Sequence, residues 1–306
     1  MRNGTRLGDL LDTRDPLVTV AVHDPLTARV VERTGEFDAI LLSGSGASLS
    51  RAGLPDMGLL TMSEMVSHAR NVQERIDLPL VVDGDDGYGG PANVVRTIRE
   101  FAAAGVGGVL LEDQARPKRH GYDADKRVIP RERAVGRLRV ALEARDDRDP
   151  SLHVIGRTDA LDAENGSVDE AIARANAFGD AGADLVYVQG PRSMEEVRRV
   201  AEEVEYPQMY EGAGSSPRLG VEETASLGFD LLHYARGVTF ATVLAVEAYA
   251  EDLAAEGTPA FEELEETFEE SYVDLQELAG RAEFRGIERA AEGEGGKRQN
   301  QPDGPE

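Results

Sequence analysis

The residues with the clearest capacity for chemistry lie in the segment LPLVVDGDDGYGG, residues 78–90. An apolar run there ends in Asp83 and continues directly into Asp85, Asp86 and several glycines. In an extended strand, residues i and i+2 lie on the same side, so Asp83 and Asp85 can together bind one hard divalent cation. Because Asp and Gly are also ordinary turn residues, a polar turn is the competing interpretation.

A second apolar run with acidic residues at its end favours the metal site over the turn. The run VLLED contains Glu112, and Asp56 lies in the loop AGLPDMG. No His accompanies these carboxylates, and an all-oxygen set of ligands favours Mg²⁺ or Mn²⁺ over zinc. The predicted metal ligands are therefore Asp56, Asp83, Asp85 and Glu112.

Polar residues also end other apolar runs, and they suit a substrate that carries carboxylate groups. Arg157 ends a buried run in IGRTDA, where a guanidinium is costly unless an anion pairs with it. That anion is either a substrate carboxylate or an internal partner, Asp83 or Asp159. The hydroxyl and backbone N–H groups of SGS suit another carboxylate, with simple turn chemistry as the alternative. The other candidate substrate-binding residues are Ser43, Gly44, Ser45, Gln189 and Glu211.

A long charged loop, ARPKRHGYDADKRVIP at residues 115–130, follows the run that contains Glu112. Loops of this length with Gly and Pro hinges often close over an active site and exclude water. His120 is a candidate general acid, although a single surface His is usually only solvated. The candidate catalytic residues of this loop are Lys118, Arg119, His120 and Tyr122.

Short apolar runs alternate with amphipathic helical stretches from residue 17 to about residue 255, which is typical of repeated βα units and a parallel sheet. Eight strands without a Gly-rich nucleotide loop after the first predict an α/β fold of the (β/α)8 TIM-barrel type rather than a doubly wound sheet. The carboxyl ends of the strands would then carry the residues named above. The predicted strands are Leu17–Val22, Ala39–Ser43, Leu78–Asp83, Gly108–Glu112, His153–Arg157, Leu185–Gln189, Pro207–Glu211 and Leu231–Tyr234.

Two further segments follow the predicted barrel domain, which comprises residues 1–258. Residues 259–290 carry apolar side chains at three- and four-residue steps, which predicts a C-terminal helical extension. Its apolar stripe must be buried either against its own barrel or against a neighbouring subunit. Residues 291–306 are polar and rich in Gly, and we predict that they are disordered.

The composition of the 306 residues excludes several classes of function. A formal net charge of −25 repels nucleic acid and anionic membranes, so neither is an expected partner. The absence of Cys excludes thiolate metal sites and Cys nucleophiles. The excess of Asp and Glu and the small number of Lys residues indicate a protein from a halophile, adapted to concentrated salt. No long apolar run and no apolar N-terminal signal occur, so the expected location is cytoplasmic.

Five motifs give the chain a resemblance to the isocitrate lyase and phosphoenolpyruvate mutase superfamily, closest in layout to its 2-methylisocitrate lyase branch. In chain order they are FDAILLSGSGAS, GLPDMGLLT, LPLVVDGDDGYGG, GVLLEDQARPKRHGY and IGRTDA. The resemblance covers roughly residues 18–251. It implies a (β/α)8 barrel, a homotetramer in which the eighth helix is exchanged between subunits, and a Mg²⁺ ion that stabilises an enolate or aci-carboxylate.

The resemblance also implies roles for individual residues. Asp83 would be the direct ligand of the metal, and three other carboxylates, those of Asp56, Asp85 and Glu112, would act largely through water. The substrate carboxylate would be bound by Ser43, Gly44, Ser45 and Arg157.

The closing loop departs from the family pattern. Lyases of the family carry Lys-Arg-Cys-Gly-His or a near relative, whereas this chain reads Lys-Arg-His-Gly-Tyr, so His120 replaces the catalytic Cys. Gln189 stands where Glu or His is usual, Glu211 where Asn is expected, and Leu41 where Tyr is usual. These changes leave metal and carboxylate binding intact and alter the groups that transfer protons.

Three functional hypotheses follow. The first is a Mg²⁺-dependent lyase that cleaves a carbon–carbon bond in a small di- or tricarboxylate of the isocitrate or 2-methylisocitrate type, with His120 or Tyr122 protonating the leaving carbanion. The second is a related enzyme, either a 2-oxo acid decarboxylase or a phosphonopyruvate-type hydrolase or mutase. The third is a homologue without turnover that still binds metal and carboxylate.

Overall fold

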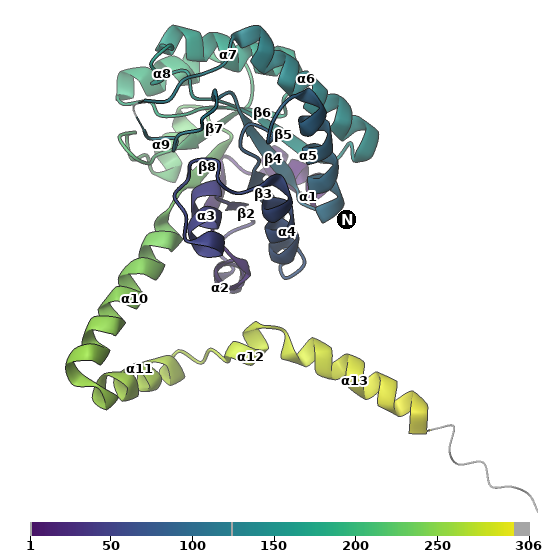
Figure 1. The fold of residues 1–306 in the computed structure, drawn as a ribbon, viewed down its shortest axis with the longest axis vertical. Coiled ribbons are helices and arrows are strands. Elements are labelled where there is room, and N and C mark those ends of the chain that lie inside the picture. Colours follow the sequence, from purple (N-terminus) through teal and green to yellow (C-terminus); the bar gives the residue numbers. More distant parts are fainter. Residues whose placement is uncertain (1, 124, 297–306) are drawn as a thin grey trace, which may run out of the picture. The chain divides into compact units, whose positions relative to one another are not determined.

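The computed structural model describes residues 2–123 and 125–296 (Figure 1). Their contacts divide the chain into two compact units, one that ends at Val243 and one that begins at Leu244, and each is described here by itself. Among the described residues, no helix is both long enough and apolar enough to cross a membrane.

The first unit is a closed barrel of eight parallel strands in chain order, in which β1 pairs with both β2 and β8 (Figure 1). The predicted TIM-type barrel is confirmed, and each of the eight predicted strands is present with its ends shifted by two residues or fewer. The strands are β1 (Leu17–Val22), β2 (Ala39–Leu42), β3 (Leu80–Asp83), β4 (Gly108–Glu112), β5 (His153–Thr158), β6 (Leu185–Val188), β7 (Gln208–Glu211) and β8 (Leu231–Tyr234).

Helices cover the outside of this barrel, and polar residues define where several of them begin. Thr61 accepts a hydrogen bond from the N–H of Glu64, whose carboxylate accepts one from the N–H of Thr61 in return, so the two residues cap α4. The helices are α1 (Asn3–Thr13), α2 (Pro25–Thr34), α3 (Gly44–Ala52), α4 (Met62–Gln73), α5 (Pro91–Ala104), α6 (Arg131–Arg148), α7 (Val168–Asp180), α8 (Met194–Glu203), α9 (Val221–Ser226) and α10 (Gly237–Glu256), which continues into the second unit.

Two apolar cores hold the barrel together. The larger lies between the strands and the surrounding helices, and the smaller fills the interior of the barrel with side chains such as Leu17, Val81 and Ile155. Leu7 of α1 is fully buried in the interior core, and Gly4 lies so close to the Ser151 carbonyl that a side chain would collide with it. Because Ser151 precedes β5, α1 closes the amino-terminal end of the barrel. The opposite, carboxyl end of the barrel contains a pocket.

The second unit consists of helices that expose apolar side chains. It contains the rest of α10, α11 (Thr258–Glu270), α12 (Leu275–Leu278) and α13 (Arg281–Gly296). The predicted extension is thus helical, with Phe261, Leu264, Phe268 and Leu275 exposed. Disorder was predicted from residue 291, and α13 continues to Gly296. Residues 297–306 lie outside the described residues.

Candidate active site

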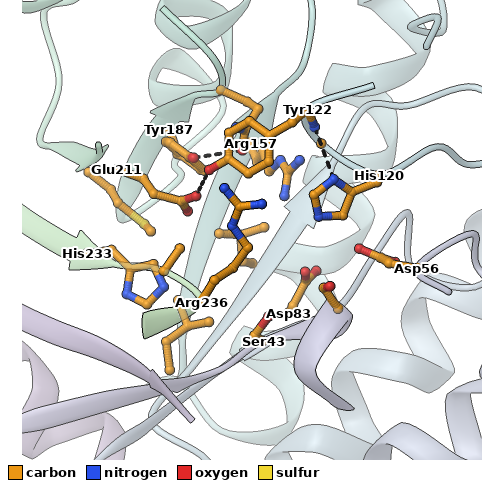
Figure 2. Close-up of a pocket in the computed structure, with 17 residues that line it drawn as sticks. Ser43, Asp56, Asp83, His120, Tyr122, Arg157, Tyr187, Glu211, His233 and Arg236 are labelled. Carbon is orange, nitrogen blue, oxygen red and sulfur yellow. Dashed lines mark hydrogen bonds between the residues drawn. The ribbon is translucent and has the colours of Figure 1, made fainter. Parts of the chain in front are cut away.

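One pocket at the carboxyl end of the barrel gathers most of the predicted site residues (Figure 2). Strand ends supply several of its walls, and the loop between β4 and α6 supplies another. Predicted residues that line this pocket are Ser43, Ser45, Asp56, Asp83, His120, Tyr122, Arg157, Gln189 and Glu211. Gly44 and Asp85 line a smaller pocket beside it, which Asp56 shares. Arg119 lies in neither pocket, because its guanidinium pairs with Asp125 at 2.8 Å.

The residues that line the pocket but were not predicted from the sequence include Tyr187 on β6, His233 on β8 and Arg236, two residues after the end of β8. β8 was predicted with its observed bounds, but no site residue was assigned to its end. The rule that active sites lie at the carboxyl ends of barrel strands points to this position as well. Arg236 in LLHYARG is the signal that could have been used.

The segment Ser43–Ser45 is the first turn of α3 rather than the end of a strand. The Ser43 hydroxyl accepts a hydrogen bond from the Gly46 N–H at 3.2 Å and so caps this helix. The beginning of α3, with its free N–H groups, faces the pocket, and a helix N-terminus favours an anion. Gly44 is required by space, since a Cβ there would lie 2.7 Å from a carboxylate oxygen of Asp83.

Asp83 and Asp85 form the acidic side of the site. The Asp85 N–H donates to the Asp83 carboxylate at 3.0 Å, and Asp85 has a φ of 47°, in the left-handed region. Burial, together with the charges of Asp83 and Asp56, raises the pKa of Asp85 to about 6 against the opposing effect of Lys118. A cation bound here would therefore relieve repulsion among carboxylates.

Lys118 is that cation in this structure. Its ammonium lies 2.9 Å from Asp56 and forms a short ion pair with Asp85, and its side chain is only 6% exposed. Burial alone would lower the pKa of Lys118, but the charges of Asp85 and Glu112 outweigh it and hold the pKa well above its usual value. Lys118 therefore ties the loop between β4 and α6 to the acidic side of the site.

Glu112 is a buried carboxylate without a hydrogen-bond donor. Its residue is 1% exposed, neither carboxylate oxygen has a hydrogen-bond partner among the described residues, and the nearest cation in an ion pair is Arg157, at 3.6 Å. Burial raises the pKa of Glu112 well above its ordinary value. An unsatisfied buried carboxylate of this kind costs free energy and favours the arrival of a cation.

The four predicted metal ligands thus fit a hard cation by chemistry, because all offer oxygen, the site is acidic and one carboxylate is unsatisfied. As they stand, however, no three acidic or His side chains within the described residues are close enough together to surround one metal ion. The ammonium of Lys118 contacts two of these carboxylates instead. The assignment of Asp56, Asp83, Asp85 and Glu112 as metal ligands remains a prediction.

Arg157 is paired within the protein. Its Nε and Nη2 each donate to Asp159 at 2.9 Å, which is the internal partnership that the sequence left open as an alternative. Lys126, which is completely buried, lies 3.1 Å from Asp159 and 2.7 Å from Asp162. Burial would raise the pKa of Asp159, but Arg157 and Lys126 lower it to about 2. Asp159 therefore neutralises part of the charge that Arg157 brings to the pocket.

His120 and Tyr122 bring proton-transfer groups from the loop to the pocket. Their rings lie 5.3 Å apart between centroids, and the Tyr122 hydroxyl forms a short hydrogen bond to Glu211 (Figure 2). Burial and the neighbouring Glu211 raise the pKa of Tyr122, whereas burial lowers the pKa of His120. At neutral pH Tyr122 therefore retains its proton, and His120 is mostly neutral.

Fold and site together define a TIM-barrel enzyme whose acidic pocket lies at the carboxyl ends of the strands. The family model for phosphoenolpyruvate phosphomutase matches residues 7–254. The chain therefore belongs to the phosphoenolpyruvate mutase and isocitrate lyase superfamily, as the sequence motifs predicted.

Individual relatives agree with this assignment. The chain is 37% identical to 2,3-dimethylmalate lyase of Eubacterium barkeri over 237 residues, which are 76% of this chain and 80% of that protein. It is 34% identical to 2-methylisocitrate lyase of Shewanella oneidensis over 236 residues, 76% and 79% of the two chains. The structure of phosphonopyruvate hydrolase with oxalate and Mg²⁺ matches with a TM-score of 0.80 and 26% identity, covering 94% of this chain and 99% of that one. The two lyases among these relatives confirm the prediction of an enzyme of the lyase type.

Proposed function

We propose that the chain is a Mg²⁺-dependent lyase that cleaves a carbon–carbon bond in a small di- or tricarboxylate of the isocitrate or 2-methylisocitrate type. The observation that carries this proposal is one pocket that brings together Asp83, Arg157 and the protonated hydroxyl of Tyr122. Such a cleavage requires an acidic wall for a cation, a guanidinium for a carboxylate, a proton donor and a base, and Glu211 in the same pocket is the candidate base.

The metal would be held by the carboxylates of Asp83, Asp85, Asp56 and Glu112, with Asp83 as the direct ligand. Mn²⁺ would suit the same oxygen donors. When bound, the ion supplies positive charge that stabilises an enolate or aci-carboxylate oxygen of the substrate. The Lys118 ammonium would have to leave the carboxylates of Asp56 and Asp85 for the ion to reach both.

The residues of this chain would then orient the substrate and move its protons. Arg157 and the beginning of α3 would hold a substrate carboxylate. In the cleavage, the Glu211 carboxylate of the pocket would take the hydroxyl proton, the oxygen would form a carbonyl group, and the electron pair of the broken carbon–carbon bond would stay on the carbon next to a carboxylate. Tyr122 would protonate that carbon, because its hydroxyl keeps its proton at neutral pH and already lies in the pocket. His120 would support Tyr122 by packing against its ring.

Product analysis tests the function directly. Purified protein is assayed with Mg²⁺ in high salt, with and without a chelator, against isocitrate, 2-methylisocitrate, oxaloacetate and phosphonopyruvate. Two carboxylic acids, one of them glyoxylate or pyruvate, support the lyase. Carbon dioxide from oxaloacetate would instead indicate a decarboxylase. Oxalate from oxaloacetate or phosphate from phosphonopyruvate would indicate a hydrolase. Tight binding of oxalate and Mg²⁺ without any product would indicate a homologue that has lost turnover.

Replacing Tyr122 by Phe is expected to lower kcat by about 10²- to 10⁴-fold, because the proton donor is lost while the ring remains. Oxalate affinity, measured by calorimetry, should stay within about twofold, since the hydroxyl contributes little to ground-state binding. His120→Ala should lower kcat less. As a matched control, Tyr206→Phe removes a hydroxyl that bonds to Asp180 on α7, away from the pocket, and should not affect kcat. An unaltered kcat in Tyr122→Phe would remove Tyr122 from the mechanism.

We further propose that the protein acts in the cytoplasm of a cell with concentrated salt, which its formal net charge of −25 would suit.

We also propose a homotetramer in which α10 is exchanged between subunits. The support for the homotetramer is the apolar character of α10, whose side chains Val243, Leu244 and Val246 are 57%, 65% and 62% exposed. Exposed apolar surface of this kind marks sites of association.

The double variant Leu244→Asp and Val246→Asp is expected to dissociate the assembly, because it places charges in an apolar interface. Light scattering coupled to size exclusion measures the mass. Glu247→Gln, on the same helix, is the control and should keep the wild-type mass. A wild-type mass for the double variant, or a monomeric parent protein, would contradict the proposal.

A further inference from the structure

Arg236 lies two residues after the end of β8 and reaches into the middle of the pocket, where its guanidinium lies beside Tyr122 (Figure 2). Its backbone has a φ of 60°, in the left-handed region that residues other than Gly rarely adopt. Such conformations persist where the surrounding structure fixes them, and they cluster at functional sites. The chain therefore holds an Arg at a position where Gly would be less strained.

The guanidinium of Arg236 has no carboxylate partner among the described residues, unlike that of Arg157, which is paired with Asp159. Its Nε is buried and makes no hydrogen bond within the part of the chain that the structure describes. The nearby Glu211 carboxylate accepts instead from the Tyr122 hydroxyl. A buried donor without a partner is costly, and in a pocket it indicates that a ligand supplies the acceptor.

Two aromatic rings hold Arg236 in position. The guanidinium carbon lies 4.7 Å from the centroid of the Tyr122 ring and 5.2 Å from that of the Phe240 ring. Contacts with ring faces orient a guanidinium while leaving the N–H groups at its edge able to donate. The planar edge of a guanidinium matches a carboxylate, which accepts two parallel hydrogen bonds from it.

The position of Arg236 in the pocket indicates which part of a substrate it would meet. Figure 2 shows Asp83 and Ser43 on one side of the pocket and Glu211 on the other, with the guanidinium of Arg236 between Glu211 and His120. A substrate whose first carboxylate is held near Asp83 and α3 would direct its far end toward Arg236. Glu211 also lines this pocket, and it forms no ion pair with Arg236 in the described structure.

We propose that Arg236 is a specificity-determining residue that binds a second, distal carboxylate of the substrate. This inference rests on the proposed function and narrows it to acids with two carboxylates separated by a carbon chain. A substrate with one carboxylate end would leave the guanidinium unsatisfied and would bind more weakly.

Calorimetry with Mg²⁺ and dead-end acids tests this without requiring turnover. Oxalate is too short to reach Arg236 and probes only the part of the pocket near Asp83. Succinate and glutarate carry a second carboxylate at the end of a carbon chain, which could reach Arg236. In Arg236→Leu and Arg236→Gln, succinate and glutarate affinity should fall by about 10- to 100-fold, the effect of losing a charge-assisted pair. Oxalate affinity should stay within about twofold. Arg192→Leu, which removes an exposed guanidinium near Asp162, is the matched control and should change neither.

A third variant separates binding from a purely structural role. Arg236→Gly relieves the left-handed backbone, so the melting temperature should not fall, while succinate affinity should still be lost. A lowered melting temperature with unchanged succinate affinity would assign Arg236 to packing against Tyr122 and overturn the inference. Equal losses for oxalate and succinate would overturn it as well. If no acid is cleaved but distal binding is lost, the lyase proposal fails and the role of Arg236 stands.

Discussion

Replacement of Asp83 by Ala is expected to lower kcat/KM by about 10³-fold or more, equivalent to about 4 kcal/mol of transition-state stabilisation. Asp83 ends β3, lines the pocket and lies against Gly44 at the beginning of α3. Its loss should also abolish the dependence of activity on Mg²⁺. Turnover at rising Mg²⁺ concentration and calorimetric titration with Mg²⁺ measure the two effects.

Two variants control for folding in this experiment. Asp83→Asn keeps an acceptor for the Asp85 N–H but removes the charge, and it should lose activity as Asp83→Ala does. Asp38→Ala removes an exposed carboxylate that pairs with Arg14 just before β2, at the opposite end of the barrel, and should retain activity. Wild-type rates in Asp83→Ala would refute the proposed role of this residue.

Arg157→Leu is expected to lower the free energy of unfolding by about 3 kcal/mol, the lower end of the typical cost of breaking a buried ion pair, because Asp159 then keeps only Lys126 as a partner. The substitution removes both hydrogen bonds to Asp159 and the only ion pair of Glu112 among the described residues. Activity should be lost as well, since the guanidinium that faces the pocket disappears. Urea unfolding at neutral pH measures the stability.

The double variant Arg157→Leu and Asp159→Asn should recover part of the lost stability, because the second change removes a buried carboxylate that would otherwise keep only Lys126 as a partner. Lys126 retains Asp162 as a partner in this background. No recovery would show that Asp159 is not the source of the cost.

The dependence of stability on pH gives a second readout of the same pair. The folded pKa of Asp159 is about 2, below its ordinary value of 3.8, so its contribution is fully present above pH 4 and is lost as pH falls toward 2. In Asp159→Asn that acid-dependent loss should be smaller.

The eight strands could be predicted because each strand of a closed parallel barrel is buried on both faces and reads as an apolar run. Polar residues interrupt those runs where the strands end, so the same pattern located Asp83, Glu112 and Arg157.

The partners of the loop residues could not be predicted, since they depend on the path that a long loop takes. Arg119 and Lys118 are neighbours in sequence, yet the first pairs with Asp125 and the second is buried between Asp56 and Asp85. Arg236 was missed for a different reason. Arg236 lies two residues beyond Tyr234, where β8 ends, so a pattern of polar residues at strand ends does not include it.

The pairing at the base of the closing loop has a consequence for how that loop moves. Gln114 bridges Val128 in an antiparallel arrangement, and the Ala115 N–H donates to the Arg127 carbonyl at 2.7 Å. The completely buried Lys126 fastens the outgoing arm. We therefore expect the loop to move about a base that stays hydrogen-bonded. A protease would then cleave the outer part of the loop before any barrel strand, and ligand entry would not change the pairing of the strands.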